Sequence, residues 1–361
     1  MLYPVEPGNE ENLKSNHILE LPFVIFNQNG IDCENDKRNH SSIKEFILTG
    51  LGEDPHQIYL FLLFFYIYII TVSGNLCIIL VYNMSLNLHN PMYFNLANFS
   101  FIEICYVSVI VPKMLSNFLV EHKSISFYGC SAQMYFAFLF GGVECYVLAS
   151  MAYDRYIAIC HPLLYNAFMN RSLCIWLLAG SWFIGAANAL VHNVLTFTLP
   201  FYGTNRINHF FCDVPALLKL ACIDTWINEV VLFAVSGCVI IGSFILIMLS
   251  YIRIILMIFN IHSRSGRKKA FSTCSSHLTV VTIFYGSVIF MYFRPKSSYS
   301  QQDCLASIMY TIIAPLLNPF IYSLKNTDVK VALVKLIKTA KHCYFHHFVS
   351  NRLKCQRNQF G

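Results

Sequence analysis

The strongest constraint on the fold of this chain is a set of seven long apolar stretches. They lie near residues 58–82, 92–115, 130–160, 173–193, 226–256, 270–293 and 304–323. A helix of about 20 apolar residues crosses the roughly 30 Å of hydrocarbon in a membrane. Strands are not expected, because the stretches lack the alternation of a membrane barrel and an open strand leaves unpaired backbone groups in lipid. The predicted fold class is therefore an all-α membrane protein, a seven-transmembrane-helix bundle.

The composition supports a surface that faces lipid. Charged residues make up 12% and hydrophobic residues 56% of the chain, whereas a soluble domain carries about 25% charged residues. Membrane lipid is thus the expected surrounding of much of the outside. The net charge of +6 is modest, so no nucleic-acid partner is expected.

The distribution of charge predicts the orientation in the membrane. Residues 1–57 carry ten acidic and four basic side chains. Basic residues surround the loop before the sixth stretch, and the tail from Lys325 onward has eight basic residues and one acid. Lysine and arginine favour the cytoplasmic side. We therefore expect a cytoplasmic C-terminus and, after seven crossings, an extracellular N-terminus.

Three regions are expected along the chain. Residues 1–57 form an extracellular, largely flexible segment, in which Asn39 begins a glycosylation sequon. Residues 58–323 form the transmembrane domain. Residues 324–361 form a cytoplasmic tail, and within it 327–341 is predicted to be a basic amphipathic helix on the inner leaflet.

The most informative motif is the string MAYDRYIAICHPL at residues 151–163. An acid and an arginine at the end of a membrane helix are costly and need a reason. Asp154 and Arg155 can pair, and such a pair holds Arg155 in a resting position until activation. For an isolated pair, the alternative is an arginine whose side chain snorkels to the interface.

Together with motifs elsewhere, this string resembles the signature of odorant receptors of the rhodopsin-like (class A) G-protein-coupled class. The order and spacing fit from about residue 39 to 341. The chain departs from the usual pattern at Glu103, where the family carries Asp, and at Asn95, where it carries Phe. The other matching motifs are Gly74-Asn75, Pro91-Met92-Tyr93-Phe94, Ser250-Tyr251, KAFSTCSSH at 269–277 and PLLNPFIYS at 315–323.

The resemblance implies a multi-pass plasma-membrane receptor rather than an enzyme. Its expected partners are a small-molecule odorant, membrane lipid and a heterotrimeric G protein of the stimulatory, olfactory type. A small, mainly apolar odorant would bind in an outer-side cavity, and the receptor would then raise cyclic AMP. The alternative is a non-signalling or non-olfactory chemosensory seven-helix receptor. A retinal pump is disfavoured because residues 304–323 contain no lysine, and a transporter because no internal repeat is found.

Two sets of site residues follow from the resemblance and from helical stepping. A mainly apolar lining with a few hydroxyls suits a small, weakly polar ligand, although each lining residue, Tyr285 included, could instead be packed core. The expected G-protein switch residues are Asp154, Arg155, Tyr251, Asn318, Pro319 and Tyr322. The expected ligand-pocket residues are Ala137, Phe138, Gly141, Ser236, Val239, Tyr285, Val288, Ile289, Tyr292 and Thr311.

Two acids, Glu103 and Glu144, are expected deep in the bundle, and the resemblance places them near Asn75 and Asn318. Two buried carboxylates cannot readily both be ionised without a cation or a proton. In related receptors this region holds sodium in the resting state, so the four residues form a candidate sodium site. The alternative is a protonated, hydrogen-bonded acid. No other cofactor is expected.

The resemblance also implies a disulfide between Cys130 and Cys212, which pins the loop after the fourth stretch over the cavity. Odorant receptors commonly add a second bridge inside this loop. The later position of that bridge is Cys222 here, but the earlier one is Tyr202. We expect Cys222 to stay a free, partly buried thiol unless it finds a different partner. The candidate partners are Cys33 and Cys304.

Overall fold

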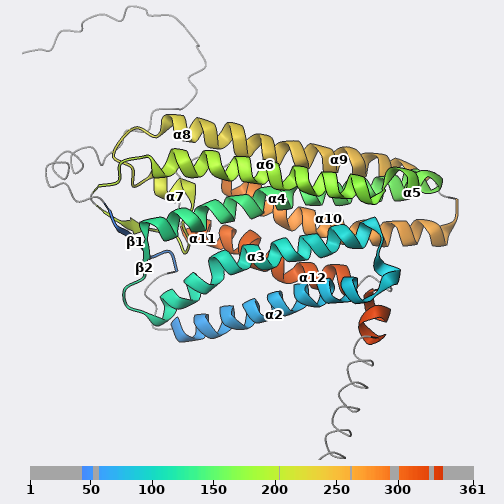
Figure 1. Cartoon of the computed structure of the whole chain (residues 1–361), viewed down its shortest axis with the longest axis horizontal. Coiled ribbons are helices and arrows are strands. Elements are labelled where there is room, and N and C mark those ends of the chain that lie inside the picture. The colour runs from blue at the N-terminus through green and yellow to red at the C-terminus, as the bar shows by residue number, and fades with distance from the viewer. Residues whose placement is uncertain are drawn as a thin grey trace, which may run out of the picture.

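Seven helices in the described part of the chain are long and apolar enough to cross a membrane. The computed structural model describes residues 43–51, 57–202, 204–260, 262–292, 301–324 and 329–335. The helices run side by side along the longest axis of the molecule (Figure 1), which confirms the predicted seven-helix bundle. The spans are Gln57–Met84, Pro91–Leu119, Phe127–Cys160, Arg171–Phe197, Trp226–Phe259, Arg264–Met291 and Cys304–Tyr322.

Five spans are continuous helices, and two contain a π-helical turn. The continuous ones are α2 (Gln57–Met84), α3 (Pro91–Leu119), α4 (Phe127–Cys160), α6 (Arg171–Phe197) and α10 (Arg264–Tyr292). The fifth span consists of α8 (Trp226–Val231), the π-helical turn Leu232–Ser236 and α9 (Gly237–Phe259). The seventh consists of α11 (Gln301–Ile308), the π-helical turn Met309–Ile313 and α12 (Ala314–Leu324). Such turns often occur at functional sites.

The first helical turns are fixed by capping residues that the sequence supplies. Asn90 accepts a hydrogen bond from the backbone of Tyr93 at 3.2 Å, with a proline at the first position of α3. Ser126 caps α4, and Asn170 caps α6 by accepting from Leu173 at 2.8 Å. These side chains satisfy backbone N–H groups that have no partner within the helix.

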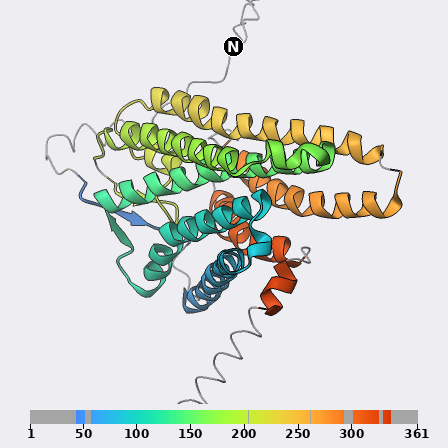
Figure 2. The same cartoon turned by 45° about the vertical axis from the view of Figure 1, so that its right-hand side comes forward.

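Close packing between α4 and α6 depends on two glycines. A Cβ atom on Gly185 of α6 would lie 2.7 Å from the carbonyl oxygen of Leu139, and one on Gly142 of α4 would lie 3.0 Å from the Cα of Gly185. Small residues of this kind let membrane helices approach closely. In both cartoon views α4 runs through the middle of the bundle, with α3 and α6 on either side (Figures 1 and 2).

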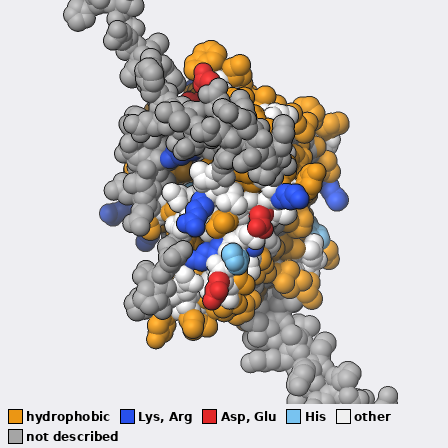
Figure 3. Space-filling view, turned by 90° about the vertical axis from the view of Figure 1, so that its left-hand side faces the viewer, with side chains coloured by type: hydrophobic (Ala, Val, Ile, Leu, Met, Phe, Trp, Pro, Cys, Tyr) orange, Lys and Arg blue, Asp and Glu red, His pale blue; other side chains and the backbone are white. Residues whose placement is uncertain are grey.

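The outer faces of the peripheral helices carry large exposed apolar side chains. On α2 they include Ile58, Leu62 and Phe65, and on α9 they include Ile241 and Leu249. Hydrophobic side chains that a soluble protein would bury therefore point outward, as lipid contact requires. Figure 3 looks onto one end of the bundle, where charged and other polar side chains lie in the visible middle and hydrophobic ones around the edge.

That end carries a small three-stranded sheet, and we call it the strand end. The sheet has the order β2-β1-β3, with β1 (Glu45–Leu48) antiparallel to β2 (Ser124–Ser126) and parallel to β3 (Arg206–Ile207). Phe46 of β1 pairs with Ile125 and is fully buried. Residues 43–51 therefore have a defined structure, while the prediction that residues 1–57 as a whole are largely flexible stays a prediction.

Short elements connect the spans at the two ends. They are α5 (Tyr165–Phe168), α7 (Val214–Leu218) and the 3-10 turns Leu86–Leu88 and Pro162–Leu164. Residues 329–335 are helical, with Val331 exposed and Val329 buried. The rest of the predicted amphipathic helix 327–341, and the sequon at Asn39, lie outside the described residues.

Candidate functional site

A cavity lies inside the bundle near the strand end. Its volume is about 70 Å³, roughly half of the ~150 Å³ that holds benzene in an engineered protein core. Its lining is mostly apolar and, among the described residues, includes no charged side chain. The lining residues are Tyr106, Ala137, Phe138, Gly141, Gly142, Cys145, Asn188, Phe211, Ser236, Val239, Ile240, Phe284, Val288 and Tyr310.

Six of the residues that the sequence proposes for the pocket lie in this lining. Ala137, Phe138 and Gly141 are spaced along one face of α4, as helical stepping expects. A Cβ atom on Gly141 would meet nothing within 4 Å, so this glycine leaves open space. The other three are Ser236, Val239 and Val288.

Tyr285 lies outside the lining and is packed core. It is 1% exposed, and its hydroxyl lies 2.8 Å from the Ser243 hydroxyl and 3.2 Å from the carbonyl oxygen of Cys145. Tyr285 therefore ties α10 to both α9 and α4. The neighbouring Phe284 contributes to the lining in its place.

Three further pocket predictions differ from the structure or fall outside it. Ile289 is exposed on the outer surface of α10, one position beyond the cavity-facing Val288. Thr311 is fully buried, but its hydroxyl donates to the Ser307 carbonyl at 2.6 Å, away from the lining. The side chain of Tyr292 lies outside the described residues.

Sequence reasoning missed the contribution of α6. Asn188 on this helix lines the cavity and is 5% exposed. The available signal was a polar residue inside an apolar helix, which usually faces the bundle interior. The predicted pocket residues all lie on the third, fifth, sixth and seventh spans, whereas Asn188 lies on the fourth.

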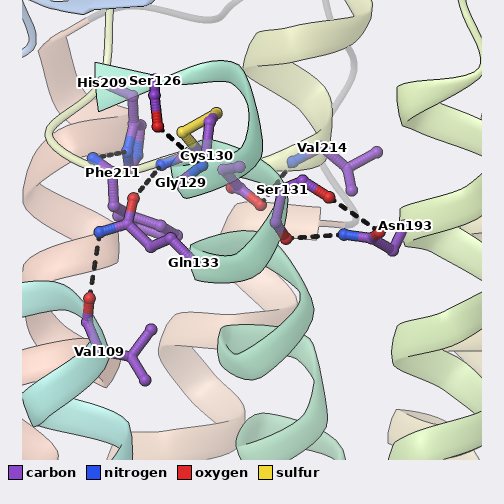
Figure 4. Close-up of a disulfide and its surroundings, with 12 residues drawn as sticks. Val109, Ser126, Gly129, Cys130, Ser131, Gln133, Asn193, His209, Phe211 and Val214 are labelled. Atoms are coloured by element: carbon purple, nitrogen blue, oxygen red, sulfur yellow. Dashed lines mark hydrogen bonds between the residues drawn. A yellow bond between two sulfur atoms is a disulfide. The ribbon is translucent and has the colours of Figure 1, made fainter. Parts of the chain in front are cut away.

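The loop between α6 and α8 covers the cavity and is fixed to α4. Cys130 and Cys212 form a disulfide with a Cα–Cα distance of 5.5 Å, as predicted. Gln133, one turn along α4, accepts a hydrogen bond from the Cys212 backbone at 3.0 Å and donates to the Val109 carbonyl at 3.1 Å (Figure 4). These bonds hold the adjacent Phe211 at the cavity.

His209 anchors the same loop to the seventh span. Its Nε2 lies 3.1 Å from the Ser307 hydroxyl on α11, and its Nδ1 accepts from the Phe211 backbone at 3.5 Å (Figure 4 shows the second bond). Burial lowers the pKa of His209 to about 4. The imidazole is therefore neutral at pH 7, which matches one nitrogen that donates and one that accepts.

Toward the opposite end, Asp154 is buried, and its hydrogen-bond partner is Tyr165 of α5 at 2.8 Å. Arg155, the expected partner, is half-buried and also interacts electrostatically with this carboxylate. The structure thus adds a partner for the acid of the motif, because Tyr165 of the short helix that follows α4 donates a hydrogen bond to it.

A three-helix connection centres on His277 of α10. Its Nδ1 lies 2.9 Å from the hydroxyl of Tyr251 on α9, and its Nε2 lies 3.2 Å from the carbonyl oxygen of Leu148 on α4. The carbonyl can only accept, so Nε2 donates and Nδ1 accepts from Tyr251. His277 ends the KAFSTCSSH motif, and the motif by itself indicates no role for this residue.

Four predicted residues meet between the cavity and the opposite end. Asn318 of α12 donates a hydrogen bond to Glu103 of α3. Asn75 of α2 donates to the carbonyl oxygens of Thr71 at 3.1 Å and Pro315 at 3.4 Å. Within these four residues, three buried acceptor oxygens have no partner in the described part of the chain. They are Asn75 Oδ1, Glu103 Oε2 and Glu144 Oε1.

The seventh span approaches α2 closely at the remaining switch residues. A Cβ atom on Gly74 would lie 3.1 Å from the ring of Pro319, so only a glycine fits there without a shift. Tyr322, one turn on, is buried, and its ring packs edge-on against Phe99 of α3 at 6.3 Å.

A membrane bundle of seven helices, with a cavity near one end and buried polar contacts toward the other, has the architecture of a seven-helix receptor. The family model described as olfactory receptor matches residues 64–340. Olfactory receptor 5AR1 of Mus musculus is 50% identical over 304 residues, which cover 84% of this chain and 98% of that protein. Olfactory receptor 5I1 of Homo sapiens is also 50% identical, over 84% of this chain and 97% of that protein. The chain belongs to the olfactory receptor family, so it is a multi-pass plasma-membrane receptor and not an enzyme.

Cys222 is disulfide-bonded, so the expectation of a free thiol is wrong. Its sulfur lies 3.6 Å from the carbonyl oxygen of Tyr202, the position where the family's usual partner would stand. Cys130 and Cys212 bond to each other, and the remaining described cysteines, Cys304 included, form no disulfide. The partner of Cys222 therefore lies outside the described residues.

We expect peptide mapping under non-reducing conditions to link Cys222 to Cys33. The other cysteines outside the described ranges, Cys343 and Cys355, follow the seventh span and are separated from Cys222 by three crossings. Cys33 precedes the first span and so shares the side of Cys222. Cys33→Ser should make Cys222 reactive toward a thiol reagent, with Cys304→Ser as the control. A Cys222 peptide that stays bridged in Cys33→Ser would contradict the assignment.

Proposed function

We propose that this receptor binds a small, mainly apolar odorant in the described cavity and activates a stimulatory, olfactory-type G protein, which raises cyclic AMP. In this proposal the strand end is extracellular and the opposite end faces the cytoplasm. The observation that carries it is an apolar, uncharged cavity under a disulfide-anchored loop. Such a lining favours neutral ligands of low polarity.

The size of the cavity indicates how binding could drive activation. A space of about 70 Å³ is too small for most odorants, so ligand entry has to displace lining side chains. Phe284 and Val288 belong to that lining and lie on α10. A ligand that binds the displaced arrangement more tightly shifts the population toward it. Movement of α10 would then expose a G-protein site near Arg155, Tyr251 and Tyr322.

Gly141→Leu should abolish odorant responses, because its side chain would fill the open space beside this glycine. Gly286→Leu is the matched control, since a Cβ there also meets nothing but lies on the exposed face of α10. Both variants would be expressed in cells with a cyclic-AMP reporter and challenged with a panel of neutral volatiles. Agonist potencies within twofold of wild type in well-expressed Gly141→Leu would overturn the cavity assignment.

The contacts of His277 support a resting conformation in which α10 is held against α4 and α9. His277→Phe keeps an aromatic ring but removes both hydrogen bonds, each worth about 1 kcal/mol. We expect basal cyclic AMP to rise at least twofold and the thermal stability of the purified receptor to fall. Tyr251→Phe, which removes one of the two bonds, should show a smaller rise. Unchanged basal signalling in both variants would argue that the hydrogen bonds of His277 do not hold α10 in the resting conformation.

We further propose that sodium binds among Asn75, Glu103, Glu144 and Asn318 in the resting state. Three unpartnered acceptor oxygens in this region support it, because oxygen ligands suit a hard cation. The alternative is a proton on one of the two acids.

Glu144→Gln should remove the sodium dependence of basal activity while preserving the shape of the side chain. The measurement compares basal cyclic AMP in membranes at matched ionic strength, with sodium or with choline as the cation. If basal cyclic AMP in wild type and in Glu144→Gln responds equally to the replacement of sodium by choline, a protonated acid describes this site better than a bound sodium ion. Cys105→Ser, a neutral change at a half-buried position of α3, controls for expression and folding.

A further inference from the structure

A chain of hydrogen bonds at the cavity wall runs in one direction, from His192 through Ser236 to Asn188. His192 and Asn188 lie one turn apart on α6, and Ser236 faces them from the π-helical turn of the fifth span. The Ser236 hydroxyl donates to Asn188 Oδ1 at 3.2 Å and lies 2.8 Å from His192 Nε2. A hydroxyl has one proton to donate. The consistent arrangement is therefore His192 donating to Ser236, and Ser236 donating to Asn188.

This arrangement leaves the amide N–H groups of Asn188 unused. No described residue accepts a hydrogen bond from Asn188 Nδ2, although the side chain is 5% exposed. Nδ2 lies 3.8 Å from the position that a Cβ on Gly142 would occupy, and both residues line the cavity. Asn193, on the same helix, differs because both the oxygen and the nitrogen of its amide are hydrogen-bonded. Its Oδ1 accepts from the Ser131 hydroxyl at 3.0 Å, and its Nδ2 donates to the Ser131 carbonyl at 2.7 Å (Figure 4).

An unpaired donor that faces an apolar cavity is costly, and an acceptor on a ligand relieves this cost. The lining holds no charged side chain to compensate a carboxylate or an ammonium group. We infer that the cavity selects neutral odorants with one oxygen acceptor, such as a ketone, ester or ether, and that Asn188 Nδ2 donates to this oxygen. This specificity rests on the proposed odorant function of the same cavity. Ser236 and His192 act as positioning residues, because they hold the amide with its N–H groups toward the ligand.

The test compares pairs of volatiles that match in shape and differ in the acceptor. Hexan-2-one and 2-methylhex-1-ene form one pair, because a methylene group replaces the carbonyl oxygen. Hexanoate and hexylamine are the charged probes. A cyclic-AMP reporter assay on intact receptor is expected to show activation by ketones and esters, at least tenfold lower potency for the alkene, and none for the charged probes. A panel without an active oxygenated member would overturn the inference.

Asn188→Leu should lower the potency of the ketone roughly tenfold, the loss of about one well-placed hydrogen bond, and leave the alkene unchanged or improved. Asn193→Leu is the matched control and should preserve the ratio between ketone and alkene. A ketone response that Gly141→Leu blocks but Asn188→Leu leaves intact would refute this inference alone. Responses that are insensitive to Gly141→Leu would instead refute the cavity as the odorant site.

Discussion

Polar groups inside a bilayer have no water to bond with, so the chain itself has to satisfy them. Within the helices the backbone N–H and C=O groups bond to each other, and near the ends of the bundle side chains provide the remaining hydrogen bonds. Gln133 uses both halves of its amide between the loop and α3, and Asn193 uses both halves of its amide on Ser131. Glu144 has a buried carboxylate oxygen without a partner in the described part of the chain, and Asn188 faces the cavity; these are the places where we propose a cation and a ligand.

The central helix α4 connects these sites along its length. It provides the disulfide to the loop at Cys130, the open wall of the cavity at Gly141 and the buried acid at Glu144. Further along α4, the carbonyl oxygen of Leu148 accepts a hydrogen bond from His277, and the carboxylate of Asp154 accepts one from Tyr165. Gly142 and Gly185 let α4 and α6 pack at close range, so in the activation that we propose the helix that moves at the cavity is α10 rather than α6.

α10 connects the cavity to the region near the proposed G-protein site, and it therefore carries the coupling that we propose between ligand binding and activation. Phe284 meets the cavity, while the adjacent Tyr285 is bonded to α9 and α4. Two turns toward the opposite end, His277 repeats the same pair of attachments. Displacement of Phe284 by a ligand thus acts directly on a helix that is held by a small number of hydrogen bonds. Packed interiors of this type shift between discrete arrangements and do not deform continuously.

The sequence alone determined the seven spans, because lipid imposes long apolar runs. The resemblance of its motifs to those of odorant receptors indicated the family and implied the Cys130–Cys212 bridge. The sequence also placed Gly141 and Val288 at the cavity, since helical periodicity fixes which residues share a face. Only the tertiary structure decided that Phe284 rather than Tyr285 lines the cavity, that Asp154 bonds to Tyr165, and that Asn188 contributes from α6. These features depend on the rotation of each helix about its axis and on contacts between residues far apart in the chain, and a periodic pattern in one segment contains neither.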